Sequence, residues 1–375
     1  MKIIIAPDKF KGSLTGIEFC DIVEAGIMEI APHSEIYKLP LADGGDGTVD
    51  VLNYYLGGEI ISLTVQNPLG NPTKASYLYS ENKHLAFIEM AEASGIKLLS
   101  NEQLNPLETS TFGTGQLILD AIKLGAKHII LGIGGSATND AGMGMARALG
   151  YWFFDSNNHE LEGKGEDLTQ LYRIDGSKKR VELDRVSFEI ACDVNNPLFG
   201  ADGAAYVYAP QKGADSKMVQ ELDKGLENFN NVVLKQYGIN IQEINGAGAA
   251  GGLGGGSVCF LNAKLKPGID LIKSIADFDN AIKDADWIIT GEGKFDAQTF
   301  SGKVIKGIID SKNNQKLAVF CGASELSEQQ LNHYGIDYID QMTNYATDIN
   351  DSIKNSKDYL KIAAHNFARL LFNVV

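Results

Sequence analysis

Short apolar runs of strand length recur near both ends of the chain, and each leads into a polar or glycine-rich loop. The runs are Lys2 to Ala6, Glu35 to Leu39, Trp287 to Thr290, Leu317 to Phe320 and, more weakly, Asp337 to Ile339. After the first run, Thr15 and Glu18 have the spacing of a capping box and predict a helix start. A pattern over Tyr359 to Leu371 predicts a closing amphipathic helix. Strands that alternate with helices are typical of a parallel sheet.

The pattern changes from about Glu59. Glu59 to Val65 and Lys74 to Tyr79 alternate between apolar and polar residues, which predicts an antiparallel hairpin. His128 to Leu131 and Val186 to Ala191 are further strand-like runs, and glycine is frequent between them and beyond. The middle of the chain therefore predicts a sheet that mixes antiparallel and parallel strands.

Two domains are expected, because 375 residues are many for a single core. We predict an α/β protein in which residues 1–60 and 265–375 form a Rossmann-like parallel-sheet domain. Residues 61–264 would form an inserted, glycine-rich, mixed α/β domain. The active site is expected in a cleft between the two domains.

The stretch from Lys127 to Gly150 combines a strand, a glycine turn and a helix start, with Ala141 to Leu149 as the helical part. Glycines let a ligand approach the backbone closely, and the N-terminus of a helix suits a phosphate. An ordinary capped turn between strand and helix would give the same pattern. The candidate cofactor-binding residues of this turn are Gly134, Gly135, Ser136, Thr138 and Asn139.

The same stretch also fits a dinucleotide-binding motif. Gly132, Gly134 and Ala137 satisfy G-x-G-x-x-G/A. Asp155 lies about 20 residues further on, where an acid that binds the ribose is expected. A nicotinamide-dependent enzyme is therefore an alternative.

The run GAGAAGGLGGG, residues 246–256, is the densest group of glycines in the chain. It matches G-x-G-x-x-G as well, but no apolar strand precedes it, and its glycines make a poor helix start. A flexible linker is disfavoured because the run has no serine or charge. We expect its backbone to pack closely against a ligand, with Gly248 and Gly251 as cofactor-binding residues.

Charged residues gather in loops that follow predicted strands, where ligands of parallel sheets bind. Lysines in such loops could hold an anionic substrate, or they could be ordinary solvated side chains. The aspartates could serve chemistry or cap a turn. The candidate catalytic and substrate-binding residues in these loops are Asp8, Lys9, Lys11, Ser13, Asp43, Asp46, Glu292 and Asp296.

Asp193 follows the strand Val186 to Ala191 and is itself followed by Asn195 and Asn196. Oxygen-rich clusters of this kind are accepted by Mg²⁺. An Asx turn before Pro197 would explain the same residues. Asp193 is the candidate metal ligand and a candidate catalytic residue.

The balance of charge narrows the class of partner. Lysine plus arginine number 33 against 48 acids, a net charge of −15, which argues against nucleic-acid and anionic-membrane partners. The four cysteines lie far apart, which favours reduced thiols in a cytosolic protein. The N-terminal apolar run is too short for a signal peptide, and no segment approaches a membrane span. We expect a cytoplasmic protein that binds small molecules.

None of the six histidines lies in the candidate loops, which disfavours histidine general-base chemistry. Aspartate, lysine, hydroxyl, amide and glycine residues fit phosphoryl transfer, where positioning and electrostatic stabilisation do most of the work. The sequence has no G-x-x-x-x-G-K-[ST] loop and no H-R-D signature, so a nucleotide site would be of another type.

Seven stretches, distributed from end to end, carry a close resemblance to the type 1 glycerate kinase family. They are MKIIIAPDKFKGSLT, LADGGDGTVD, GTGQLI, GIGGSATNDAGMGMARALG, CDVNNPLFGADGAA, GAGAAGGLGGG and DWIITGEGKFDAQTFSGK. The resemblance implies ATP-dependent, Mg²⁺-requiring phosphorylation of D-glycerate, usually at the 2-hydroxyl. It also implies two α/β domains, one of them Rossmann-like.

We assign roles within that resemblance by inference. Lys9, Lys11 and Ser13 would hold the glycerate carboxylate or the transferred phosphate. Asp193 would bind metal or act as base, with Asp43 and Asp46 next, while the Gly134 turn cradles phosphates and Glu292 and Asp296 close the site from the other domain. The alternatives are an NAD(P)-dependent hydroxyacid dehydrogenase and a non-catalytic binding protein with a hinged cleft.

Overall fold

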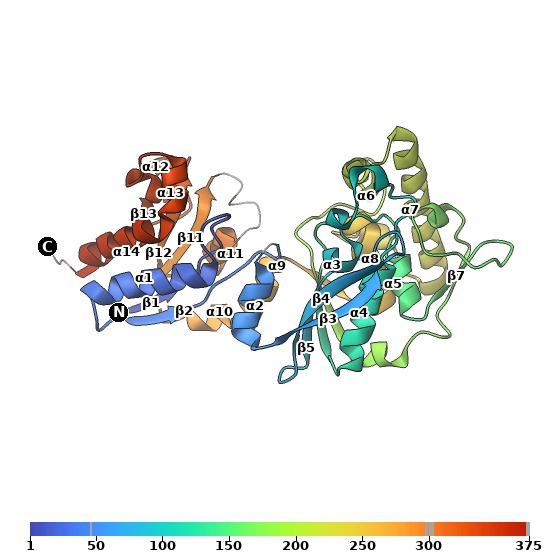
Figure 1. The fold of residues 1–375 in the computed structure, drawn as a ribbon, viewed down its shortest axis with the longest axis horizontal. Coiled ribbons are helices and arrows are strands. Elements are labelled where there is room, and N and C mark those ends of the chain that lie inside the picture. Colours follow the sequence, from blue (N-terminus) through green and yellow to red (C-terminus); the bar gives the residue numbers. More distant parts are fainter. Residues whose placement is uncertain (46, 297–298, 300–303, 373–375) are drawn as a thin grey trace. The chain divides into compact units, whose positions relative to one another are not determined.

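The computed structural model describes residues 1–45, 47–296, 299 and 304–372, and the chain divides into two compact units. Unit 1 is Met1–Tyr55 with Pro267–Val375, and unit 2 is Leu56–Lys266. Each unit is built on its own sheet (Figure 1). The predicted α/β class is confirmed, with both termini in one parallel-sheet unit.

Unit 1 has a five-stranded parallel sheet in the order β13-β12-β11-β1-β2. Its strands are β1 (Lys2–Ile5), β2 (Glu35–Lys38), β11 (Trp287–Phe295), β12 (Lys316–Ser324) and β13 (Tyr338–Gln341). Its helices are α1 (Gly16–Ile30), α2 (Thr48–Leu56), α9 (Gly268–Ile275), α10 (Phe278–Ala281), α11 (Val304–Ser311), α12 (Glu328–His333), α13 (Ile349–Lys354) and α14 (Ser356–Phe372). The chain leaves β1 for β2 on one side and returns to β11 on the other. Strand order therefore reverses between β1 and β11, and such a switch point is where ligands of open α/β sheets bind.

Helix α1 begins where the sequence predicts it. The Thr15 hydroxyl accepts the Glu18 N–H at 3.1 Å, and the Glu18 carboxylate accepts the Thr15 N–H at 3.0 Å, which confirms the capping box. The helix packs on α14 where Gly26 faces Ala364. Phe19 of α1 and Phe367 of α14 are fully buried, and the ring of each contacts Phe320 of β12.

Unit 2 has a mixed six-stranded sheet in the order β10-β9-β6-β5-β4-β3. Its strands are β3 (Glu59–Gln66), β4 (Pro72–Ser80), β5 (Leu85–Glu89), β6 (His128–Gly132), β9 (Ser187–Ala191) and β10 (Lys264–Lys266), while β7 (Trp152–Phe154) and β8 (Arg173–Asp175) form a separate antiparallel pair. Strands β3, β4 and β5 are antiparallel neighbours, and β5, β6, β9 and β10 run parallel. The predicted hairpin is confirmed, with Glu59 opposite Tyr79.

The helices of unit 2 are α3 (Ala91–Ser94), α4 (Phe112–Lys123), α5 (Met143–Ala148), α6 (Ala204–Tyr208), α7 (Ser216–Tyr237) and α8 (Ala249–Leu261). Short 3₁₀ turns in the chain are η1 (Ile96–Leu98), η2 (Asn101–Gln103), η3 (Glu166–Thr169), η4 (Val181–Arg185), η5 (Pro210–Lys212), η6 (Ile241–Glu243) and η8 (Met342–Asn344). None of the helices in the described part of the chain combines the length and apolar character that crossing a bilayer requires.

Three elements differ from the sequence pattern. Strand β11 continues past Thr290 to Phe295, because residues 291–295 keep pairing with β12, so Glu292 lies in a strand and not in a loop. Helix α5 begins at Met143 and not at Ala141, since Ala141 and Gly142 have positive φ angles of 52° and 74°. The glycine run forms the buried helix α8, which a left-handed turn over residues 250–252 interrupts.

Candidate active site

The predicted site residues fall into two clusters, one on each unit. Unit 1 carries Asp8, Lys9, Lys11, Ser13, Asp43, Glu292 and Asp296, and unit 2 carries Gly134, Gly135, Ser136, Thr138, Asn139, Asp193, Gly248 and Gly251. Asp46 lies outside the described residues. The cleft expected between the two domains stays a prediction.

The cluster of unit 1 begins at the switch point of its sheet. The Asp8 N–H donates to the Gly291 carbonyl of β11 at 2.9 Å, which fixes the start of the loop after β1. The Asp8 carboxylate then accepts the Lys9 N–H at 2.7 Å. Phe10 anchors the middle of the loop, since its ring is buried and stacks on Phe19 with 5.3 Å between centroids. A polar loop is therefore held on an apolar base.

A hollow of about 340 Å³ lies over this loop. Residues 8–18 line it on one side, and Leu41, Ala42, Gly47, Asp50 and Val51 line it on the other. The aliphatic part of Lys9 lies against Gly47, where a Cβ would come within 3.1 Å of the Lys9 Cδ. Asp43 is next to this lining, and its carboxylate accepts the Gly45 N–H at 3.0 Å. The hollow thus offers ammonium groups, a hydroxyl and carboxylates to a small polar anion.

Glu292 and Asp296 hold the end of β11 in place. The buried Glu292 carboxylate accepts the Thr299 hydroxyl. The same Thr299 oxygen accepts the Asp296 N–H at 3.2 Å, and the Asp296 carboxylate pairs with Lys294 at 3.2 Å. Both acids lie at the switch point, beside the loop after β1. Part of their hydrogen-bonding and ion-pairing capacity is used by neighbouring residues of the same segment, Thr299 and Lys294.

The cluster of unit 2 lies at the carboxyl edge of its parallel strands. After Gly132, the last residue of β6, backbone hydrogen bonds join the chain to the segment that follows β5. Ile96 N–H donates to the Gly135 carbonyl at 2.9 Å, and Ala137 N–H donates to the Ser94 carbonyl at 2.9 Å. Gly135 has a φ of 69°, which glycine adopts without strain. The turn that results is exposed at Gly134 and Gly135, and a Cβ at Gly134 would meet no atom within 4 Å.

Lys212 lies directly behind this turn, although no sequence signal marked it as a site residue. Its side chain is 1% exposed, and its ammonium donates to the Ser136 hydroxyl at 2.8 Å and to the Thr138 carbonyl at 2.7 Å. Burial lowers the pKa of this ammonium to about 7, while the carboxylate of Asp140 opposes the shift. A polar loop with one lysine gives no sign of burial, so only the fold reveals this residue.

Asp140 ties the segment to the rest of unit 2. Its carboxylate is fully buried and accepts the Thr111 N–H and hydroxyl, each at 2.7 Å, and the N–H groups of Gly142 and Gly144. The Thr111 hydroxyl in turn accepts the Met145 N–H at 2.8 Å, so it bonds to both Asp140 and Met145. Burial raises the pKa of Asp140, and the four donors oppose that shift because they favour the ionised form.

Thr138 and Asn139 are buried and not displayed on the turn. Both are 0% exposed, and the Thr138 hydroxyl and both polar atoms of the Asn139 amide have no hydrogen-bond partner among the described residues. Unpaired buried polar atoms are costly. Contact with a ligand at these two side chains would need an intervening water or a shift of the segment.

Gly248 and Gly251 face the protein's own backbone. A Cβ at Gly251 would lie 2.1 Å from the Thr138 carbonyl oxygen, and one at Gly248 would lie 2.1 Å from the Pro197 carbonyl oxygen. The close approach that we expected between this run and a ligand is therefore made to neighbouring segments. Packing also explains why a glycine-rich run forms a helix against its low propensity.

Asp193 follows β9, the neighbour of β6, and its side chain is exposed at the same edge of the sheet as the Gly134 turn. Asn196 serves the loop instead, since its amide donates to the Asp202 carbonyl at 2.8 Å and accepts the Tyr208 hydroxyl at 2.6 Å. Within the described part of the chain, no group of three His, Cys, Asp or Glu side chains could hold a metal. A metal here would need oxygen ligands from a bound phosphate.

Comparison with known proteins identifies the family. The family model described as "Glycerate kinase family" matches residues 3–372. The chain is 42% identical to a glycerate kinase of Halalkalibacterium halodurans, over 98% of this chain and 97% of that one. It is 38% identical to the glycerate 2-kinase of Escherichia coli, over 99% and 98% of the two chains. The chain belongs to the glycerate kinase family.

A solved structure supports the same conclusion for the fold of this glycerate kinase family member. A crystal structure assigned to glycerate kinase 2 of Salmonella typhimurium LT2 has a TM-score of 0.89 and 37% identity to the chain. The similarity covers 100% of this chain and 98% of the other. The protein is accordingly an enzyme of the phosphotransferase class, and its fold is that of two α/β domains.

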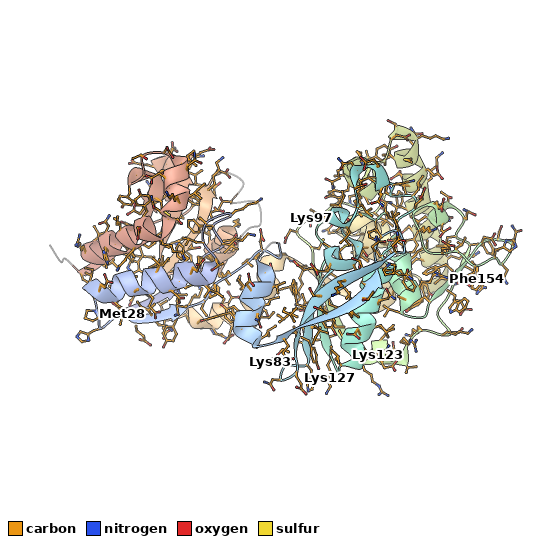
Figure 2. The ribbon with its side chains drawn as sticks, viewed as in Figure 1. Met28, Lys83, Lys97, Lys123, Lys127 and Phe154 are labelled. Atoms are coloured by element: carbon orange, nitrogen blue, oxygen red, sulfur yellow. The ribbon has the colours of Figure 1, made fainter. Side chains whose placement is uncertain are left out.

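The dinucleotide interpretation does not fit this family member. Asp155 accepts the N–H groups of Asn157 and His159 at 2.8 and 2.7 Å in a turn after β7, and β7 lies outside the parallel sheet. The His159 N–H is the main cause that holds the pKa of Asp155 below its usual range. Phe154 is next to Asp155 in the sequence, and Lys97 is next to Ile96, whose N–H donates to the Gly135 carbonyl. Figure 2 shows Phe154 and Lys97 on opposite sides of unit 2. The acid is thus remote from the glycine turn.

Two glycine substitutions test which glycines of unit 2 are needed for packing and which are exposed at the surface. Gly251→Ala places a Cβ against the Thr138 carbonyl at a residue whose φ is 69°, so we expect a loss on the order of 3 kcal/mol in the free energy of unfolding. Gly134→Ala meets nothing and should change that free energy by less than about 0.5 kcal/mol. Urea unfolding of both variants measures the difference, and equal stabilities would contradict the packing role of Gly251.

Proposed function

We propose that this protein transfers the terminal phosphoryl group of ATP to a hydroxyl of D-glycerate and that its product is 2-phosphoglycerate. The observation that carries the proposal is the exposed Gly134–Gly135 turn, backed by the buried ammonium of Lys212. Family membership supports glycerate as the acceptor. The relative from Escherichia coli, a glycerate 2-kinase, supports the 2-hydroxyl as the position of transfer.

The donor phosphates are assigned to unit 2. The exposed turn leaves room for phosphate oxygens close to the backbone at Gly134 and Gly135, which a Cβ would fill. The Ser136 hydroxyl, already held by Lys212, is next to that room. Positioning and positive charge are what phosphoryl transfer needs from a protein.

The acceptor is assigned to unit 1. Glycerate is a small anion with two hydroxyls, and the hollow over the loop after β1 offers Lys9, Lys11 and Ser13 to it. The two lysines would hold the carboxylate and the serine a hydroxyl. Asp43, whose carboxylate is steadied by Gly45 N–H, is the candidate base that takes the proton of the attacking hydroxyl.

The residues present fit Mg²⁺. The exposed Asp193 supplies a carboxylate oxygen at the edge of the sheet that carries the Gly134 turn, and Mg²⁺ is commonly held by one or two carboxylates with phosphate oxygens. When bound, the ion would neutralise charge on the phosphate oxygens. Asp193 would then position the phosphates relative to the turn.

A direct assay tests the function and its alternative together. With D-glycerate, ATP and Mg²⁺ we expect formation of ADP and 2-phosphoglycerate, identified by ³¹P NMR. With D-glycerate and NAD⁺ or NADP⁺ we expect no reduced cofactor, and Asp155→Ala should leave the kinase kinetics unchanged. Reduction of NAD⁺ that Asp155→Ala abolishes would establish the dehydrogenase instead.

The role of Asp193 is tested by a change that keeps its shape. Asp193→Asn should lower kcat by about 100-fold or more, because it removes the charge that would bind the metal or act as base. The fold should be unaffected, since the side chain is exposed. Asp202→Asn, also exposed and in the same loop, is the matched control. A folded Asp193→Asn protein with near-native turnover would refute the assignment.

The lysines after β1 should affect the acceptor and not the donor. Lys9→Ala and Lys11→Ala should each raise the KM for glycerate by 10-fold or more, because a charge-assisted hydrogen bond contributes roughly 1.5–3 kcal/mol. The KM for ATP should stay the same. Lys354→Ala removes an exposed lysine of α13 in the same unit and serves as the control. If neither variant changes the KM for glycerate, the hollow is not the acceptor site.

A further inference from the structure

Lys212 occupies an unusual position for a lysine. Its side chain is almost fully buried, and its ammonium is bonded to two uncharged acceptors, the Ser136 hydroxyl and the Thr138 carbonyl. No ion pair joins it to a carboxylate in the part of the chain that the structure describes. A buried charge without a counter-ion is unfavourable, so its placement calls for a physical reason.

The backbone holds Lys212 firmly in this position. It ends the turn η5, its N–H donates to the Ala209 carbonyl at 3.0 Å, and Pro210 starts the turn. The next residue, Gly213, has a φ of 95° and packs so tightly that a Cβ would lie 2.3 Å from the Leu104 carbonyl oxygen. The two acceptors flank Ala137, so the ammonium is fixed behind the exposed turn. An ammonium has three N–H donors, and these two contacts use two of them.

The neighbouring acid does not neutralise Lys212. Asp140 is the charged group that acts on it from the adjoining segment, but its carboxylate accepts four hydrogen bonds from Thr111, Gly142 and Gly144. Desolvation is therefore the stronger influence, and the pKa of Lys212 is lowered to about 7. An anion at the turn would supply the missing counter-charge.

We propose that Lys212 is the cation of the donor site and that it takes up a proton from solvent when the ATP phosphates bind at the Gly134–Ser136 turn. This inference rests on the proposed function. In the free enzyme the group can be uncharged, which avoids a buried unpaired charge. In the complex the phosphate charge favours the ammonium, which has a third N–H to donate beyond the bonds to Ser136 and Thr138. Binding of the donor and protonation of Lys212 are thus linked.

The linkage has a definite sign. Below pH 7 the lysine is already protonated in the free enzyme, so binding takes up little. Above pH 7 the complex holds more protons than the free enzyme, so affinity falls as the pH rises until the pKa of the complex is reached. At pH 8 we expect an uptake close to one proton per ATP, and a Kd that increases about 10-fold per pH unit between pH 8 and 9.

Calorimetry of Mg-ATP binding, in two buffers with different ionisation enthalpies, measures the uptake. At pH 8 the nucleotide is fully ionised, so its own protonation contributes little. The wild-type protein should take up close to one proton. Lys212→Gln should take up none and bind ATP at least 10-fold more weakly, while Lys217→Gln, which removes an exposed lysine five residues away, should behave as wild type. Lys212→Arg, permanently charged, should bind without uptake.

A measurement without nucleotide tests the free enzyme separately. Because the folded-state pKa of about 7 is below the usual 10.5, unfolding takes up a proton between these values. The unfolding equilibrium constant of wild type relative to Lys212→Gln should therefore fall as the pH rises above 7, by up to 10-fold per pH unit. If Lys212→Gln does not fold, Lys212→Arg replaces it.

The outcomes are distinct. ATP binding to wild type without proton uptake at pH 8 would overturn the role of Lys212 and leave the proposed function standing. Uptake that persists in Lys212→Gln would assign the proton to another group and overturn it as well. Wild-type protein that does not bind ATP would overturn the proposed function, and this inference with it. Uptake that is lost only in the Lys212 variants supports the proposal.

Discussion

The exposed Gly134–Gly135 turn of unit 2, where we propose that the donor phosphates bind, depends on direct packing of backbone against backbone. Helix α8 can approach the segment after β6 because Gly251 and Gly256 have no side chains, and a Cβ at either would lie within 2.1 Å of the Thr138 or Ala141 carbonyl oxygen. The Ala141 N–H donates across the contact to the Gly251 carbonyl at 3.1 Å. Two further elements are bonded to the same segment: Thr111, before α4, donates to the Asp140 carboxylate, and Lys212, in η5, donates to the Thr138 carbonyl. One tightly packed junction therefore sets the shape of the exposed turn.

This junction also explains local strain. Ala141 and Ala250 both have positive φ angles, of 52° and 53°, which cost roughly 1–2 kcal/mol each for a residue with a side chain. Strained residues persist only where the surroundings hold them, and they cluster at functional sites. Here one strained alanine, Ala141, lies in the segment after β6, and the other, Ala250, lies in α8, so each belongs to one side of this contact. The stability of the surrounding packing maintains a turn that local preference would not form.

The sequence predicted those parts of the fold that depend on local patterns. The Thr15–Glu18 capping box and the hairpin of β3 and β4 need only neighbouring residues, and the structure confirms both. The extension of β11 to Phe295 escaped prediction because Gly291, Glu292 and Gly293 are poor strand formers that pairing with β12 overrides. The helix in the glycine run escaped for the same reason, since tertiary contacts and not propensity stabilise it.

The sequence could predict those candidate site residues that lie in loops directly after strands. Lys9 and Gly134 stand in loops that directly follow strands, so their place at a sheet edge could be inferred. Lys212 could not be found in this way, because it is brought to the turn from 74 residues away by the Thr138 contact. Nor could burial of Asn139 be inferred, since polar clusters after strands are usually read as exposed. Both properties depend on contacts that are distant in sequence.

The central claim is that the Gly134 turn receives the donor phosphates while the glycine run serves as its scaffold. Hydrogen exchange followed by mass spectrometry, with and without Mg-ATP, tests it most directly. We predict that peptides over residues 132–138 become protected when the nucleotide binds, while peptides over 246–256, already buried, exchange slowly in both states. Nucleotide-dependent protection of residues 246–256, with none at 132–138, would contradict the account.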